Sequence, residues 1–128
     1  MISKVIAEDL IHKVQKEIDK AETMVIVVHV GPDGDAMGSA LGLWHYLMTI
    51  DKEPQVIVPT AFPDFLAWMP GADKVLVYEN DKQKCDEIIA ATDLIFTLDF
   101  NVLNRLAGME QVVKDAVAPK ILVDHHLH

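Results

Sequence analysis

The feature that most constrains the fold of this chain is an apolar, β-branched run at residues 24–29, which stops at Gly31-Pro32. A strand that is apolar at consecutive positions, rather than at alternate ones, must be buried on both of its faces. Strands of this kind belong to parallel sheets that helices cover on both sides. The run therefore predicts an α/β fold.

Further strands and helices alternate along the rest of the chain. We expect strands at residues 55–58, 74–78, 94–98 and 120–123. We expect helices at residues 3–21 and 36–50, a helix through Cys85 that a capping box of Asn80 and Gln83 begins, and helical pieces at residues 101–106 and 109–116. The helix at 36–50 is so rich in apolar residues that we expect it to be buried nearly all round, with Gly38 and Gly42 allowing a neighbouring backbone to approach closely. The pattern predicts a doubly wound, mostly parallel sheet of about five strands with helices on both faces.

Length and charge narrow the functional classes. The 128 residues suit one domain that spans residues 1–128, and no apolar run approaches the roughly 20 residues that cross a bilayer. A net charge of −9 excludes a broad basic face for nucleic acid, so a phosphate ligand would need local cations. Cys85 is the one cysteine and cannot form an internal disulfide, and the chain does not open with a secretory signal. We therefore expect a cytoplasmic protein without a membrane partner.

Carboxylate and imidazole side chains follow three of the predicted strands. The chemistry-bearing residues are His29, Asp33 and Asp35 after the first strand, Asp99 after the strand at 94–98, and Asp124, His125 and His126 after the last. In an open α/β sheet, ligands bind at the carboxyl ends of the strands. Bare carboxylates brought together there would repel one another, and divalent cations remove that conflict. Because the donors are oxygen and imidazole nitrogen rather than thiolate, the pattern favours Mn²⁺, with Mg²⁺ or Co²⁺ as alternatives.

Each of these residues also has a purely structural interpretation. The Asp33-Gly34-Asp35 segment could be a turn, His29 could be a buried histidine, and Asp99 could cap a helix. His125 and His126 could belong to an exposed terminal tract. Since every one of these groups follows a predicted strand, we favour a shared metal site over this set of unrelated explanations.

Other histidines and aromatic residues receive structural interpretations. His12 lies off the apolar stripe of its helix and is expected to be solvated, whereas His45 is expected to pack within its helix. An apolar knot among prolines, made of Phe62, Phe65, Trp68 and Met69, is more typical of a loop anchor. Base stacking or a protein interface at this knot stays open.

The motifs resemble those of the DHH phosphoesterase superfamily, in its branch of oligoribonucleases and phosphoadenosine phosphatases. Its first motif is matched by residues 29–39, its second by Asp99, and the motif that names it by Asp124-His125-His126. The resemblance runs from about residue 24 to residue 126 and preserves the order of the motifs. It implies a metal-dependent hydrolase of short oligonucleotides or of 3′-phosphoadenosine 5′-phosphate.

The resemblance also implies a role for each residue. His29 and Asp33 would hold one Mn²⁺ ion, Asp35 and His125 would hold the second, and Asp99 would bridge the two. His126 would face the substrate phosphate, and Asp124 would orient the neighbouring imidazoles. The reaction would use a hydroxide that both ions activate.

The family pattern contains parts that these 128 residues lack. A fourth motif with another metal-binding aspartate, and a second domain that binds substrate, would both follow His128. We therefore expect the 128-residue chain alone to have little or no phosphoesterase activity. The sequence leaves open which phosphorylated substrate is used and whether the chain forms a homodimer.

Two other functions compete with this one. In an aspartyl-nucleophile phosphatase Asp33 would attack phosphorus, but that chemistry leaves His29, His125 and His126 without a role. A non-enzymatic α/β domain could instead bind a nucleotide or a protein partner. Gly31, Gly34 and Gly38 are spaced wrongly for a dinucleotide loop, and the adjacent aspartates would repel a pyrophosphate.

Overall fold

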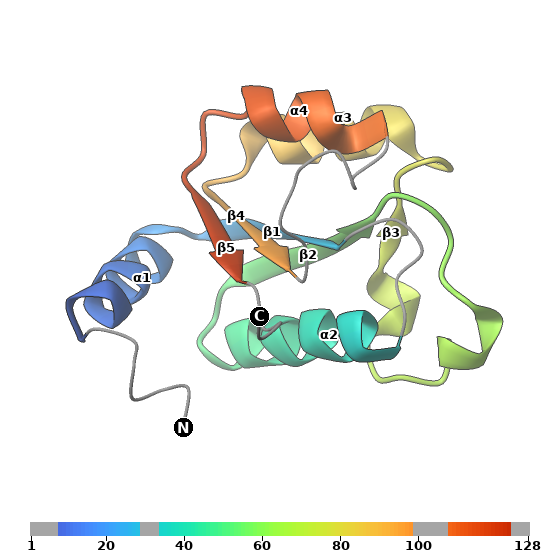
Figure 1. Cartoon of the computed structure of the whole chain (residues 1–128), viewed down its shortest axis with the longest axis horizontal. Helices are drawn as coiled ribbons and strands as arrows, with labels where there is room; N and C mark the ends of the chain where they lie inside the picture. Colours follow the sequence, from blue (N-terminus) through green and yellow to red (C-terminus); the bar gives the residue numbers. More distant parts are fainter. Residues whose placement is uncertain (1–7, 29–33, 99–107, 124–128) are drawn as a thin grey trace, which may run out of the picture.

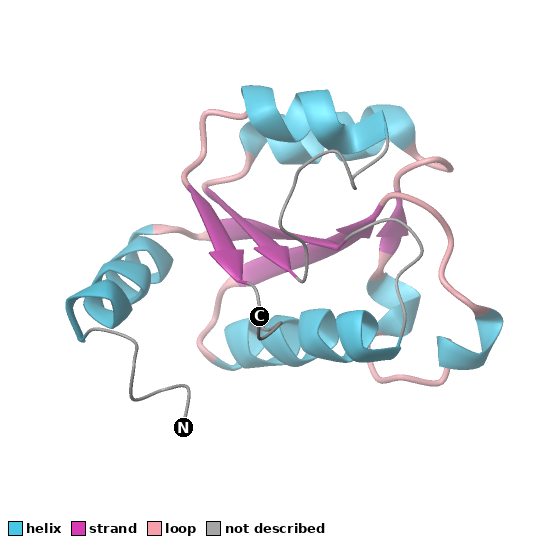
Figure 2. Ribbon diagram, in the orientation of Figure 1, coloured by secondary structure: helices cyan, strands magenta, loops and turns pink. Residues whose placement is uncertain are grey.

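A five-stranded, all-parallel sheet forms the middle layer of the protein in the computed structural model, which describes residues 8–28, 34–98 and 108–123. The strand order is β3-β2-β1-β4-β5, and every neighbouring pair is parallel. Helix α2 covers one face of the sheet, and helices α3 and α4 cover the other (Figures 1 and 2). The expected α/β fold, a doubly wound parallel sheet with helices on both faces, is therefore confirmed.

The bounds of the elements follow the sequence patterns closely. The strands are β1 (Thr23–Val28), β2 (Glu53–Val58), β3 (Leu76–Val77), β4 (Leu94–Leu98) and β5 (Lys120–Val123). The α-helices are α1 (Glu8–Lys20), α2 (Gly34–Thr49), α3 (Lys82–Ala91) and α4 (Glu110–Asp115), and the 3₁₀ turns are η2 (Asp64–Leu66) and η3 (Ala72–Lys74). The helical piece expected at residues 101–106 lies outside the described residues.

Strand β1 lies at the centre of the sheet and is buried on both faces. Met24, Ile26 and Val28 belong to the core cluster on the α2 side, whereas Val25 and Val27 belong to the cluster on the side of α3 and α4. These five side chains expose at most 1% of their surface. Their burial explains the unbroken apolar run, because side chains at successive positions enter opposite halves of the core.

Helix α2 is less buried than its composition predicted. Ala36, Met37, Ala40, Leu41 and Leu47 line the inner face and expose 3% or less, but Tyr46 and Met48 are about half exposed, at 55% and 49%. The outer side of the helix faces solvent, because exposed residues recur every three or four positions, at Ser39, Gly42, Tyr46 and Thr49, whereas Leu47 in the last turn is fully buried. The expectation that this helix is buried nearly all round was wrong.

Three finer expectations were also wrong. A Cβ on Gly42 would meet nothing within 4 Å, so this glycine permits no close approach. Helix α3 begins after Asp81, and no side chain there makes a capping hydrogen bond, so Asn80 and Gln83 do not form a capping box. Strand β3 is shortened because Lys74 belongs to the preceding η3 turn, in which its N–H donates to the carbonyl of Gly71.

No helix among the described residues is both long enough and apolar enough to cross a lipid bilayer.

Candidate metal centre

The carboxyl ends of strands β1, β4 and β5 are aligned across the sheet. Val28, the last residue of β1, is the register partner of Leu98, the last residue of β4. Leu98 is in turn the partner of Val123, the last residue of β5. Since neighbouring strands lie about 4.8 Å apart, the three strands end side by side along one edge of the sheet, which we call the carboxyl edge.

The strand order makes this edge a natural ligand site. The chain builds β2 and β3 on one side of β1 and then returns to build β4 and β5 on the other. The order therefore reverses between β1 and β4, and a crevice forms at the carboxyl ends of the strands where such a reversal occurs. Val28 and Leu98 border that position.

The predicted ligands follow directly from these aligned ends. His29 comes after Val28, Asp99 after Leu98, and Asp124 after Val123. The candidate residues that lie outside the described residues are His29, Asp33, Asp99, Asp124, His125 and His126. Asp35 is the second residue of α2, so its backbone lies in the first turn of that helix. The first turn of a helix favours negative charge. The side chain of Asp35 is not among the side chains that the structure describes. The described backbone thus brings together the three points from which the predicted site residues leave the sheet.

No cluster of three or more histidine, cysteine, aspartate or glutamate side chains that could hold a metal ion occurs within residues 8–28, 34–98 and 108–123. Cys85 lies inside α3 and is fully buried. Burial raises the pKa of its thiol, and the nearby Asp81 and Asp86 carboxylates act in the same direction. Cys85 is therefore poorly suited to be a thiolate ligand or a nucleophile.

The opposite edge of the sheet carries an aspartate with a structural role. Asp93 precedes β4, and its Oδ2 accepts hydrogen bonds from the N–H groups of Glu22 and Thr23, at 3.0 and 3.2 Å. These bonds hold the pKa of the Asp93 carboxyl below its ordinary value. The Asp93 N–H also donates to the Thr23 hydroxyl, so this residue ties the start of β4 to the start of β1.

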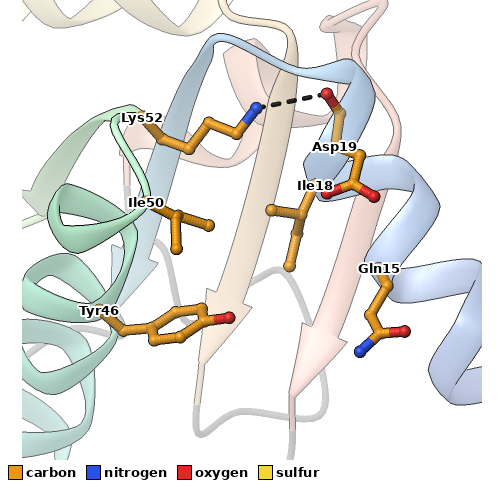
Figure 3. A pocket seen from close by; sticks show the side chains of 6 residues that line it. All are labelled: Gln15, Ile18, Asp19, Tyr46, Ile50 and Lys52. Carbon is orange, nitrogen blue, oxygen red and sulfur yellow. Dashed lines mark hydrogen bonds between the residues drawn. The ribbon is translucent and has the colours of Figure 1, made fainter.

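A groove of about 460 Å³ lies at this same amino edge, between α1 and the end of α2 (Figure 3). Its lining consists of Gln15, Ile18, Asp19, Tyr46, Ile50 and Lys52. The Lys52 ammonium, one residue before β2, donates to the main-chain carbonyl of Asp19 at 3.3 Å. Since Ile50 and Lys52 lead into β2, the groove is at the end of the sheet opposite the predicted ligands. This groove was not predicted from the sequence, because none of its residues belongs to a recognisable motif.

Tyr78 occupies the carboxyl edge on the other side of β2. Its N–H donates to the carbonyl of Val58, and its hydroxyl donates to Asp86 Oδ1 at 2.6 Å. Burial of the side chain, followed by this hydrogen bond and the charge of Asp86, raises the pKa of Tyr78 to about 12. The hydroxyl is therefore held neutral and serves to join β3 to α3.

Comparison with known protein families identifies the family of this chain. Residues 23–128 match the DHH family, N-terminal domain. The chain belongs to the DHH family. The matched segment begins at the first residue of β1 and takes in all three aligned strand ends.

Two similar proteins place this DHH chain among longer relatives. It is 34% identical over 101 residues to the bifunctional oligoribonuclease and PAP phosphatase NrnA of Thermus thermophilus, a match that covers 79% of this chain and 27% of that protein. It is also 48% identical to an exopolyphosphatase-related protein from Bacteroides fragilis of known crystal structure, with a TM-score of 0.94. That match covers 98% of this chain and 37% of the Bacteroides chain. The DHH chain thus spans about a quarter to a third of these relatives.

Proposed function

We propose that this chain is the metal-binding part of a phosphoesterase that hydrolyses phosphodiester or phosphomonoester bonds. The observation that supports the proposal most strongly is the register Val28–Leu98–Val123, since a histidine or an aspartate follows each of these residues. Membership of the DHH family and the hydrolase named among the similar proteins point to the same reaction class.

The donor set fits two divalent cations. The residues that follow the aligned strand ends supply carboxylate and imidazole groups, and the one thiol, Cys85, is buried within α3. Mixed oxygen and nitrogen donors favour Mn²⁺, with Mg²⁺ or Co²⁺ as alternatives, over metals that prefer sulfur. Metal ions would also offset the net charge of −9, which otherwise repels phosphate.

Each residue receives a role in this proposal. His29 and Asp33 would hold one ion, Asp35 and His125 the other, and Asp99 both, a role supported by the position of β4, the strand before Asp99, between β1 and β5. Bound cations would supply Lewis acidity and a nucleophile at neutral pH. His126 would contact the substrate phosphate, and Asp124 would accept hydrogen bonds from the imidazoles and fix their orientation.

The proposed substrate class rests on one of the similar proteins. The Thermus protein is described as a bifunctional oligoribonuclease and PAP phosphatase, and both names refer to nucleotides that carry phosphate esters. We therefore propose short oligonucleotides or 3′-phosphoadenosine 5′-phosphate as substrates of this protein.

The test is hydrolysis of a short RNA and of 3′-phosphoadenosine 5′-phosphate, with Mn²⁺ and with excess chelator. The proposal expects metal-dependent release of phosphate or nucleotide when residues 1–128 are fused to the substrate-binding part of a longer relative, and little or none from residues 1–128 alone. Release that persists in chelator would overturn it, as would trapping of a phosphoryl mimic on Asp33, which an aspartyl-nucleophile phosphatase would give. Tight binding of nucleotide without any turnover would favour a non-enzymatic domain.

A further inference from the structure

One large aromatic side chain is exposed although its neighbours are anchored. In the segment that joins β2 to β3, Leu66 is buried, and Phe62 and Met69 are partly buried against the core on the α2 side. Trp68, in contrast, leaves 75% of its surface exposed. A side chain that anchors the loop would be buried against the core, as Leu66, Phe62 and Met69 are wholly or partly. The loop-anchor interpretation therefore does not explain Trp68.

The backbone around Trp68 is held in defined turns. The N–H of Ala67 donates to the carbonyl of Asp64 at 3.0 Å, and the N–H of Met69 donates to the carbonyl of Leu66 at 3.1 Å. The turns on both sides of Trp68 are therefore fixed by main-chain hydrogen bonds. An aromatic side chain on a fixed backbone has only two side-chain torsions to order, so it loses little conformational entropy when it binds a ligand.

Met69, next to Trp68, lies against the first half of α2, the half nearer the carboxyl edge, whereas Pro70 and Gly71 lie against the second half of the helix, at His45 and Trp44. A Cβ on Gly38, four residues into α2, would lie 3.7 Å from Met69 Cε. Gly71, at a φ of +93°, lies against the Trp44 ring, where a Cβ would come within 3.0 Å. In Figure 1 the segment with η2 lies near the end of α2 that begins with Gly34, the end that joins the predicted first motif.

The charge of the segment indicates what Trp68 could bind. Between Pro59 and Val75 the ionisable residues are Asp64, Asp73 and Lys74, so this surface has no cluster of cations for a phosphate. A neutral indole face instead suits the π-face of a nucleobase, which stacks on exposed aromatic rings in single-stranded nucleic acid complexes. Stacking also needs no positive charge on a protein whose net charge is −9.

We propose that the exposed indole of Trp68 stacks on a nucleobase of the substrate. The phosphate ester would lie at the carboxyl edge, and Trp68 would hold a base next to it. This inference rests on the proposed function, and it adds a side chain that distinguishes nucleotide substrates from phosphate esters that carry no base.

The test measures binding of two probes to the protein with Mn²⁺ present. One probe is a hydrolysis-resistant phosphorothioate RNA dinucleotide, and the other is an abasic ribose-phosphate dimer of the same charge. Trp68→Ala should weaken binding of the dinucleotide by about 5- to 150-fold, the usual range for loss of one stacking contact, and leave the abasic dimer unchanged. Trp68→Phe should restore most of the affinity, because it keeps an aromatic face.

Tyr46→Ala is the matched control. Tyr46 is also an exposed aromatic, at 55%, but it lies at the other end of α2, beside the groove of Figure 3. This variant should bind both probes as the wild type does. Quenching of indole fluorescence by the dinucleotide should be present in the wild type and absent from Trp68→Phe.

Other results would overturn the inference. Equal weakening of both probes by Trp68→Ala would mean a structural role, and unchanged binding of both would mean that no base contacts Trp68. A change in oligomeric state of Trp68→Ala, measured by light scattering, would assign the side chain to a protein interface. If the wild type hydrolyses an unmodified abasic diester but Trp68→Ala binds both probes as the wild type does, the proposed function stands and this inference fails. If the wild type hydrolyses no phosphate ester in the presence of metal, the proposed function fails.

Discussion

Two aspartates flank the same strand and illustrate how differently the two edges of the sheet are used. Asp93 immediately precedes β4, and Asp99 immediately follows it. Asp93 accepts two main-chain N–H hydrogen bonds that join β4 to β1. Asp99 follows Leu98, which aligns with the last residues of both neighbouring strands.

The contrast teaches that residue type alone does not identify a functional carboxylate. At the amino edge, the N–H groups at the starts of parallel strands provide donors, and an aspartate there satisfies the backbone. At the carboxyl edge, the strands end in carbonyl groups, so an acidic residue there needs a cation or another donor. The position of an aspartate relative to strand direction therefore distinguishes the stabilising role of Asp93 from the chemical role that we propose for Asp99.

The largest expected effect comes from exchanging these two aspartates for asparagine. Asp99→Asn should lower metal-dependent hydrolysis by more than about 100-fold, the upper range for loss of a group that only supports a ligand. Asp93→Asn should leave kcat/KM unchanged, because Asp93 lies at the opposite edge. Steady-state kinetics on a short RNA would measure both, and equal losses in the two variants would contradict the assignment.

The next effect is stabilisation by metal. Mn²⁺ at about 100 times its Kd should raise the free energy of unfolding by about 2.7 kcal/mol, since binding to the native state alone shifts the equilibrium. Asp93→Asn should retain this gain and Asp99→Asn should lose most of it. Thermal melts with Mn²⁺ and with chelator would measure the difference, and identical melts of the wild type in both conditions would argue against a metal centre.

Tyr78→Phe tests whether the hydroxyl of Tyr78, a polar group at the carboxyl edge, has a structural role or a catalytic one. It removes the hydroxyl that donates to Asp86, and we expect a loss of about 1 kcal/mol in stability with unchanged activity. The folded-state pKa of about 12 exceeds the ordinary value of 10, so this contribution is complete below pH 10 and fades as pH rises toward 12. Denaturant titrations of both proteins across that range would detect it; a loss of hydrolysis in Tyr78→Phe would instead extend the active site to β3.

The smallest effect is the acid dependence at the amino edge. The pKa of Asp93 is lowered in the folded state, so its stabilising contribution is complete above the ordinary value of 3.8 and is lost as pH falls through the lower, folded-state value. Asp93→Asn keeps an amide oxygen as acceptor but cannot titrate. The difference in melting temperature between wild type and variant should therefore shrink below pH 4, and a constant difference would contradict the assignment.

Elements that depend on local sequence, above all the strands, were predicted well. The bounds of β4 and β5 agree with the structure, and β1 differs by one residue, because apolar β-branched runs report burial in a sheet directly. The position of the candidate ligands at strand ends followed from the same runs. The alignment of those strand ends needed the strand order, which places β4 next to β1 although β2 and β3 come between them in the chain.

Features that depend on tertiary context could not be predicted. The apolar composition of α2 did not reveal that its outer face, with Tyr46 and Met48, is exposed to solvent. Likewise, the spacing of Asn80 and Gln83 matched a capping box, but the helix begins one residue later. The exposure of Trp68 among buried neighbours depends on how the segment packs on α2, which its composition does not record.

The central position of β1 has a consequence for synthesis of the chain. Met24 pairs with Leu94, so one side of β1 stays unpaired until the ribosome has added the 70 residues from Val25 to Leu94. At about 5 to 20 residues per second that interval lasts roughly 4 to 14 s. A bare, apolar strand edge is prone to pair with other chains during such a delay. The nascent chain should therefore depend on chaperones most strongly before Leu98 is translated.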